Sequence, residues 1–432
     1  MTIKTFDWRR IEFGKNSRLL FRSLLSLSPF FILARLLTAA GQLVAGRWLG
    51  PHQYGLVTLA VATSAILTIP LNLGFAPGMV KFTASEERAE ARAVVISTAV
   101  WINLIIAIPC LMIMYWPRRI ISSWLHLDVS VFVWSLAYSG LISAYTLISS
   151  IPQALSRMNQ RGWAEFIYGG AAFLLFFPLY FALGGSYVEF MLSLIIALTA
   201  AIVVVLYWSR DHIFFTLDLQ ALRKISSYFL STVVANIFAV FVYSVSPLIL
   251  ASRLSTSSAG VLSMYEFGSL GVAAVLSQIL VTVLMPLASS PARQNGAWKK
   301  MLLLSVPSAF LCFLLLIPAD YAALKLVGRG YPIHLSWIAV FSAAGALSVI
   351  AAAANTLLTA RDASSVWLGT LGCIFGGPVS LGTLLWAIPR YGFIGAGLAA
   401  LATYAFSFLW ATGCGLYKIY SSEQRLPSAA RL

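Results

Sequence analysis

The sequence has 432 residues, of which 60% are hydrophobic and only 10% are charged, and its formal net charge is +15. A soluble domain carries about 25% charged residues, so this composition excludes a soluble protein and predicts a polytopic membrane protein. The positive charge is then explained by cytoplasmic loops and anionic lipid, and no nucleic-acid motif accompanies it, so we expect membrane lipid and no nucleic acid as a partner.

No sequence motif points to catalysis or to a bound metal. The sequence contains no GxSxG, no Walker loop, no HExxH and no carboxylate pair of the DxD type. The cysteines and histidines lack metal-ligand spacing: Cys110, Cys312, Cys373 and Cys414 fall in apolar runs, and His52, His126, His212 and His334 in predicted loops. We therefore expect a transporter without cofactor or metal, and not an enzyme.

Two apolar segments near the start, residues 23–45 and 54–75, are each long enough to cross a hydrocarbon core of about 30 Å. The turn between them, residues 46–55, contains Gly and Pro, which interrupt helices. Ten further apolar segments follow, at residues 93–116, 131–150, 164–183, 188–208, 226–250, 260–284, 301–318, 333–358, 365–388 and 392–417. The pattern predicts an all-α integral membrane protein with about 12 transmembrane helices.

The chain also repeats itself. Residues 49–59 (LGPHQYGLVTL) and 254–264 (LSTSSAGVLSM) resemble each other at an offset of 205, each at the junction of two predicted helices. Two groups of six helices with one orientation make a parallel repeat, with the substrate path between the groups. We expect a basic N-terminus (1–22), a first lobe (23–208), an amphipathic interfacial linker (209–225), a second lobe (226–417) and a tail (418–432).

The loop charges predict the orientation. With the N-terminus inside, the predicted cytoplasmic segments carry 21 Lys and Arg and the outer segments carry 7. Because short cytoplasmic loops are enriched in Lys and Arg, both termini are predicted to be cytoplasmic. In a bacterium, this is a multi-pass protein of the inner membrane.

Arg35 is the one cation in the interior of a predicted helix. It lies 12 residues into the first segment, about 18 Å deep at 1.5 Å per residue. A guanidinium at this depth costs roughly 3 kcal/mol, so it faces a wet cavity or a partner. Thr38 and Gln42 follow on the same helix face. The alternative is a structural pairing of Arg35 with a backbone or amide group.

Polar residues at helical spacing are the other candidates for a substrate path. Stripes run through Ser64, Thr68 and Asn72, through Ser139, Ser143, Thr146 and Ser150, through Asn236 and Tyr243, and through Ser348, Asn355 and Thr359. The candidate substrate-binding residues are Arg35, Lys81, Gln42, Asn72, Asn236, Tyr243 and Asn355. They predict a hydrophilic, positively charged lumen suited to a sugar joined to phosphate, although Ser and Thr also pack between membrane helices.

Acidic residues are scarce in the predicted helices. Glu165, Glu189 and Asp320 are expected at helix ends, where water reaches them. Glu266 lies about 9 Å inside the eighth segment, and it is a candidate for pairing with a cation or for binding a proton. Arg47 and Arg253, near the outer ends of the first and seventh segments, are candidates for an outer gate or for coupling, with snorkelling as the alternative.

Several segments resemble a known family. ARLLTAAGQLVAGRWLGPHQYGLVTLAVA (34–62) and LNLGFAPGMVKF (71–82) are similar to the amino-terminal signature of bacterial polysaccharide flippases of the Wzx type. These proteins belong to the multidrug/oligosaccharidyl-lipid/polysaccharide exporter superfamily. GVLSMYEFGSLG (260–271), LMPLAS (284–289) and IPRYGFIGAGLA (388–399) resemble patterns of the second lobe. Glu266 departs from the small residue that usually follows the tyrosine.

The resemblance implies two six-helix lobes in a V around a central cavity. It also implies transport of undecaprenyl-diphosphate-linked oligosaccharide units from the cytoplasmic to the periplasmic leaflet by alternating access, for O-antigen, capsule or exopolysaccharide synthesis. Other polysaccharide assembly proteins are then expected partners. One alternative is a multidrug and toxin cation antiporter of the same fold. Another is a membrane glycan polymerase or ligase, although the longest predicted outer loop here is only about 14 residues.

The predicted orientation can be tested by cysteine labelling in a variant whose native cysteines have been replaced. A cysteine at Ser257 should react with an impermeant maleimide added outside the cell, and a cysteine at Ser226 should not. Labelling at Ser226 without labelling at Ser257 would invert the topology.

Overall fold

The computed structural model describes residues 15–226, 229–288, 291–328, 330–360 and 363–424, and within these ranges all regular structure is helical. Eleven helical stretches of this described part are long and apolar enough to cross a membrane, and the first, Phe30–Thr68, includes most of both segments of the first predicted pair. Helices satisfy every backbone polar group internally, as a bilayer demands. The predicted all-α membrane fold is confirmed.

The helices follow one another with short connections. They are α1 (Lys15–Thr68), α2 (Phe75–Ser85), α3 (Ala89–Tyr115), α4 (Arg118–Trp124), α5 (Val129–Ile148), α6 (Ser150–Ala154), α7 (Met158–Leu183), α8 (Tyr187–Ser209), α9 (Leu219–Ser226), α10 (Phe229–Tyr243), α11 (Val245–Arg253), α12 (Thr256–Glu266), α13 (Val272–Ala288), α14 (Pro291–Val327), α15 (Leu335–Thr359), α16 (Ala363–Tyr391) and α17 (Phe393–Gln424). A π-helical turn, Phe267–Gly271, connects α12 to α13.

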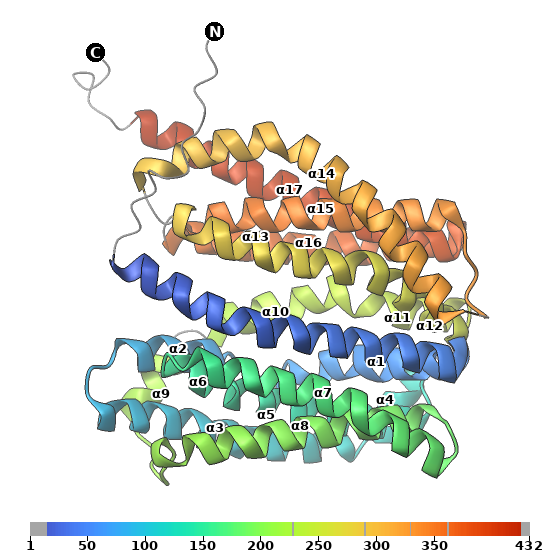
Figure 1. The fold of residues 1–432 in the computed structure, drawn as a ribbon, viewed down its shortest axis with the longest axis horizontal. Helices are drawn as coiled ribbons and strands as arrows, with labels where there is room; N and C mark the ends of the chain where they lie inside the picture. Colours follow the sequence, from blue (N-terminus) through green and yellow to red (C-terminus); the bar gives the residue numbers. More distant parts are fainter. Residues whose placement is uncertain (1–14, 227–228, 289–290, 329, 361–362, 425–432) are drawn as a thin grey trace.

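The first helix reverses direction at Gly50. Gly50 has φ 70° and ψ 172°, a conformation that glycine adopts without a steric penalty. The chain reaches one end of the bundle there and returns toward α2 (Figure 1). We call this the Gly50 end, and we call the opposite end, where α2 and α9 lie, the linker end.

The linker between the two groups of helices is less helical than expected. Only Leu219–Ser226 forms an α-helix, after the short 3₁₀ turn Arg210–His212. Hydrogen bonds hold the extended part against α3: Trp101 Nε1 donates to the carbonyl oxygen of Phe214 over 2.8 Å, and the Phe214 amide donates to Ser97 Oγ over 2.8 Å. The linker is therefore attached to the first group of helices.

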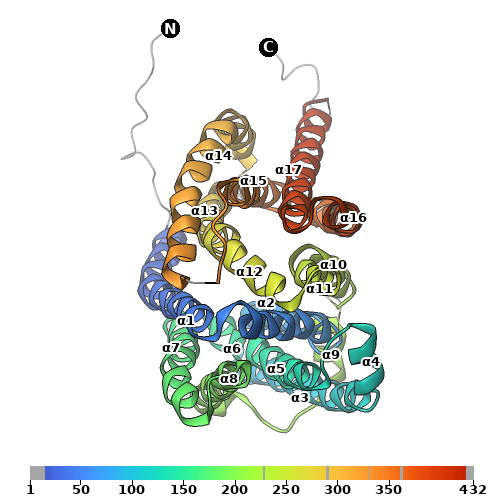
Figure 2. The same ribbon diagram turned by 90° about the vertical axis from the view of Figure 1, so that its right-hand side faces the viewer.

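The helices form two groups that meet at α1 and α12. The helices α1 to α8 pack among themselves, as do α10 to α17, and α12 lies against α1 (Figures 1 and 2). Seen from the Gly50 end, α10, α11 and α12 lie between the first group and the outer helices of the second (Figure 2).

Two glycines make the contact between the groups at the Gly50 end. A Cβ on Gly55 would collide with the carbonyl oxygen of Thr256, and a Cβ on Gly260 would collide with that of Pro51. Pro51 and Thr256 are 205 residues apart, as are Gly55 and Gly260, so the contact joins equivalent positions of the sequence repeat. Such a self-complementary contact is expected between elements related by a two-fold axis.

Hydrogen bonds reinforce this closure. The Tyr331 hydroxyl donates to the carbonyl oxygen of Gly46 over 3.1 Å, and Arg47 Nη1 donates to the carbonyl oxygen of Leu326 over 3.0 Å. Both bonds join α1 to the end of α14 or the segment that follows it. The two groups are thus held together at the Gly50 end.

The closure predicts an effect of a single methyl group. Gly260→Ala should separate the two groups at the Gly50 end, because the added Cβ has no room beside Pro51. Ser263 lines the cavity, so a cysteine at this position reports access to it. The measurement is the rate at which that cysteine reacts with a maleimide added on the side where a cysteine at Ser257 is labelled. We expect a several-fold faster reaction.

The matched control is Gly382→Ala in α16, where an added Cβ meets no atom within 4 Å. An unchanged rate in Gly260→Ala, with both variants folded, would contradict the role of this contact.

Candidate functional site

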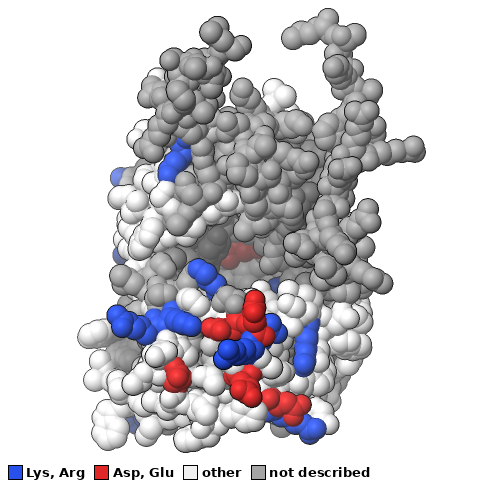
Figure 3. Space-filling view, turned by 90° about the vertical axis from the view of Figure 1, so that its left-hand side faces the viewer, with Lys and Arg blue, Asp and Glu red and all other residues white. Residues whose placement is uncertain are grey.

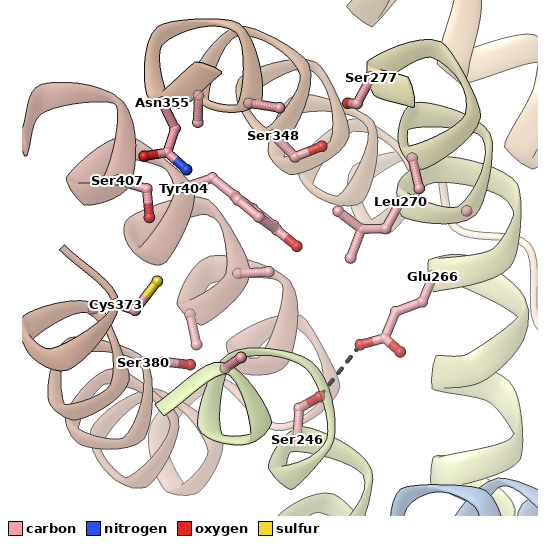
Figure 4. Close-up of a pocket in the computed structure, with 18 of the residues that line it drawn as sticks. Ser246, Glu266, Leu270, Ser277, Ser348, Asn355, Cys373, Ser380, Tyr404 and Ser407 are labelled. Atoms are coloured by element: carbon pink, nitrogen blue, oxygen red, sulfur yellow. Dashed lines mark hydrogen bonds between the residues drawn. The ribbon is translucent and has the colours of Figure 1, made fainter. Parts of the chain in front are cut away.

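A cavity of about 650 Å³ lies within the second group of helices, lined by α10–α13, α15–α17 and Gln42 of α1. Much of its lining is small or carries neutral polar groups. Hydroxyl, amide and carboxyl side chains point toward its interior from several helices (Figure 4), including Ser246, Glu266, Ser277, Ser348, Asn355 and Ser407.

Two smaller cavities adjoin it on the side of the first group. One, of about 240 Å³, shares Gln42, Ser263 and Glu266 with the large cavity. The other, of about 390 Å³, shares Tyr138 and Ser244 with its smaller neighbour. We call the three together the central cavity, because their shared walls place them side by side, from the interior of the second group to the facing side of the first.

The central cavity lies between groups that touch at the Gly50 end. From the linker end, the surface is hollowed between the two groups of helices (Figure 3). The shape is therefore that of a V whose closed end is the Gly50 end and whose open end is the linker end.

Glu266 occupies the wall that the large and the 240 Å³ cavities share. It is the last residue of α12, so it lies about 15 Å from the start of that helix by its rise. Its Oε1 accepts a hydrogen bond of 3.3 Å from Ser246 Oγ (Figure 4). Glu266 is the acidic residue that lines these cavities in the described part of the chain.

The structure brings five of the predicted residues together. Asn72 and Asn236 line the 390 Å³ cavity, Asn355 lines the large one, and Gln42 and Glu266 line two cavities each. They come from both groups of helices, as expected for a path between two lobes. Tyr243 ends α10, but its side chain lies outside the described part.

Arg35 and Lys81 lie outside the three cavities. Arg35 is exposed, with its guanidinium 4.9 Å from the centre of the Phe31 ring. It precedes Gln42 by seven residues, so it lies on the same face of α1, about 10 Å nearer the linker end. Lys81 is exposed on α2, with Nζ 5.8 Å from the centre of the Phe82 ring. Both cations therefore lie toward the linker end and outside the three cavities.

Arg47 and Arg253 are exposed at the Gly50 end, and neither lines the central cavity. Arg47 binds the carbonyl of Leu326 across the closure. Arg253 ends α11.

Two expectations about polar residues are wrong. The stripe on the fourth predicted helix is not lumenal, because Ser139, Ser143 and Ser150 are buried between helices. Two of the three acids expected at wet helix ends are buried: Glu189 lies in the first turn of α8 but is only 4% exposed, and Asp320 is completely buried because α14 continues to Val327. Helical spacing identifies a common face but does not show what covers it.

Sequence reasoning missed an ion pair at the linker end. Arg161 Nη2 lies 2.8 Å from Glu165 Oε1, Arg161 also donates to Ser149 Oγ, and its guanidinium is 6.0 Å from the centre of the Tyr145 ring. The spacing of four residues on a helix was the available signal. Sequence reasoning also missed a pair of hydroxyl groups, those of Tyr138 and Tyr168, which lie 3.1 Å apart at the wall of the 240 Å³ cavity.

The lining offers both donors and acceptors of hydrogen bonds, together with the carboxylate of Glu266. Serine hydroxyls and carboxamides both donate and accept hydrogen bonds. Among the described residues no cluster of His, Cys, Asp or Glu could hold a metal ion.

The model of a family described as "Polysaccharide biosynthesis protein" matches residues 44–319, more than half of the chain. Among curated proteins no match was found. The matched region begins within α1 and ends within α14. It therefore includes most of the first group of helices and the first part of the second group.

Solved structures of multidrug transporters share the fold. An inward-facing multidrug resistance MATE family transporter of the MOP superfamily is 14% identical, with a TM-score of 0.64, over 94% of this chain and 99% of that one. An outward-facing MATE family transporter gives 13% and 0.55, over 96% and 100%. A mutant of the Vibrio cholerae MATE transporter VcmN gives 13% and 0.58, over 94% and 98%.

The family match rests on the sequence and the likeness to the MATE structures rests on the fold, and both extend over more than half of the chain. The protein has the fold of the MATE transporters, and it belongs to the family of polysaccharide biosynthesis proteins.

Proposed function

We propose that the protein is a flippase for polyprenyl-diphosphate-linked oligosaccharide. It would move the repeat units of a surface polysaccharide from the cytoplasmic to the periplasmic leaflet of a bacterial inner membrane. The observation that carries the proposal is a cavity into which hydroxyl and amide side chains point from several helices, beside small and apolar residues and Glu266, in a chain of a polysaccharide biosynthesis family.

The positions of the cations support a division of labour along the path. Lys81 at the linker end would attract the diphosphate, and Arg35 would hold it above the cavity. Gln42, Asn236 and Asn355 would then bind the sugars within. The polyprenyl tail would remain in lipid, because burying a long hydrocarbon chain in a polar cavity gains nothing.

Transport would proceed by opening of the Gly50 end and closing of the linker end. The backbone contacts of Gly55 and Gly260 are the ones that must separate. With the linker end in the cytoplasm, the membrane potential would favour outward movement of an anion by about 2.3 kcal/mol per charge per 100 mV. Cytoplasmic termini, the two lobes at 23–208 and 226–417, and contacts with other polysaccharide assembly proteins belong to this proposal.

Glu266 favours a second candidate function. A carboxylate between the two halves of a transporter suits a cationic substrate or a coupling ion, as in a multidrug and toxin exporter. Neither Arg35 nor Lys81 lines the cavity, so neither side chain would repel a cation bound beside Glu266. The two candidates make different demands on Arg35 and Glu266.

Substitutions of Arg35 test the flippase. Arg35→Ala and Arg35→Gln should each lower export at least tenfold, since neither retains a charge for the diphosphate. Arg35→Lys should retain part of the activity, because a point charge still binds phosphate without the bidentate geometry. The measurement is surface polysaccharide in a strain that lacks the native gene, normalised to the amount of membrane-inserted protein.

The matched control is Arg118→Gln. Arg118 is half-buried and is likewise stacked on a neighbouring ring, 4.3 Å from the centre of Tyr115, but it begins α4 and lines none of the three cavities. The Arg118→Gln protein should export as much polysaccharide as the wild type. Full export by Arg35→Gln would end the claim that this cation binds substrate.

Substitution of Glu266 tests the cation exporter. If that function is correct, overproduction should raise the efflux of a cationic dye, and Glu266→Gln should remove the gain, because the carboxylate charge is lost. If the flippase is correct, neither protein should change dye efflux measurably. Dye retention in intact cells is the measurement, with membrane protein levels as the control.

A further inference from the structure

Asp320 is a buried carboxylate that the transport path does not use. It lies on α14, and its exposed fraction is 0%. Neither of its carboxylate oxygens has a hydrogen-bond partner in the described part of the chain. The end of α14 at Val327 is seven residues further on, about 10 Å by helix rise, so Asp320 is well inside the span.

No cation of a neighbouring element reaches this carboxylate. The α13 and α15 segments contain no titratable residue. On α12, the Tyr265 hydroxyl donates to the carbonyl oxygen of Pro332 and accepts from the amide of His334, while Glu266 is turned to the cavity. On α1, Arg47 binds Leu326, and on α14 itself Tyr321 and Lys325 are exposed.

The π-helical turn covers the carboxylate. A Cβ on Gly268 would lie 2.5 Å from Asp320 Oδ1 and 2.6 Å from its Cα, so this glycine is what allows the two backbones to approach. On its other side the same turn faces the cavity, through Phe267, Leu270 and Gly271. Asp320 is therefore separated from the central cavity by a single turn of an irregular helix. Such π turns often occur at functional sites.

Burial determines which ligand this carboxylate can hold. An ionised carboxylate without partners in a dry site is expensive, and a protonated one costs much less. Na⁺ or another hard cation would need several oxygen ligands, and the described residues supply no polar atom within hydrogen-bond distance of Asp320. A proton needs none.

We propose that Asp320 is a proton-binding site and that its protonation favours the conformation open at the linker end. In this conformation the packed π turn excludes water, so the carboxyl holds its proton. Loss of the proton favours a state in which the turn separates from α14 and hydrates the carboxylate. Since ligand binding and conformation are linked, acid stabilises the open linker end and alkali depopulates it. The proposal rests on alternating access in the proposed function, but not on the identity of the cargo.

Distance measurements on the purified, full-length protein in lipid nanodiscs test this. Spin labels at Glu87 and Val366, both exposed at the linker end of opposite groups, report the opening. In the otherwise wild-type protein the population with the longer distance should fall as pH rises, by at most about tenfold per pH unit for one proton. Asp320→Asn, which resembles the protonated acid, should keep the longer distance at every pH.

The matched control is Asp128→Asn, which removes an exposed carboxylate and should leave the pH dependence intact. A pH response of Asp320→Asn equal to that of the wild type would overturn the proposal. So would a response that is lost in Glu266→Gln instead, since the proton would then bind in the cavity.

A second measurement covers the case in which Asp320→Asn does not fold. In the Glu266→Gln protein, infrared spectroscopy at neutral pH should show the carbonyl band of a protonated carboxylic acid, shifted in D₂O. A missing band would overturn the proposal. Neither measurement contains lipid-linked sugar, so a negative result leaves the flippase proposal standing, and failed export of polysaccharide leaves these results valid.

Discussion

The close approach of α1 and α12 at the Gly50 end is the contact on which the arrangement of the two halves depends. Gly55 and Gly260 allow each backbone to touch the turn of the other half, at Thr256 and Pro51. Small residues allow such approaches between membrane helices, where packing takes the place of the hydrophobic effect. Any larger side chain at either glycine would separate the halves.

The position of this contact determines where the cavity opens. Because the halves touch at one end, the space between them widens toward the linker end, where the surface is hollowed (Figure 3). Equivalent residues of the sequence repeat supply the two sides of this contact.

The cavity and its approach differ in charge. Cations lie outside the cavity on α1 and α2, whereas its lining combines hydroxyls, amides and Glu266. The irregular turn Phe267–Gly271 belongs to both sides of the wall, since its outer face packs on Asp320 and its inner face lines the cavity.

The sequence by itself determined the membrane class, the helical segments, the repeat and five residues of the cavity lining, among them Gln42, Asn236 and Glu266. These follow from local properties: hydropathy over about 20 residues, and the helical period that places polar residues on one face. Only the tertiary structure decided which polar faces meet a cavity. Ser139 and Asp320 look no less accessible in the sequence than Asn72, but their surroundings come from helices distant in the chain. Burial depends on that packing, and no local pattern encodes it.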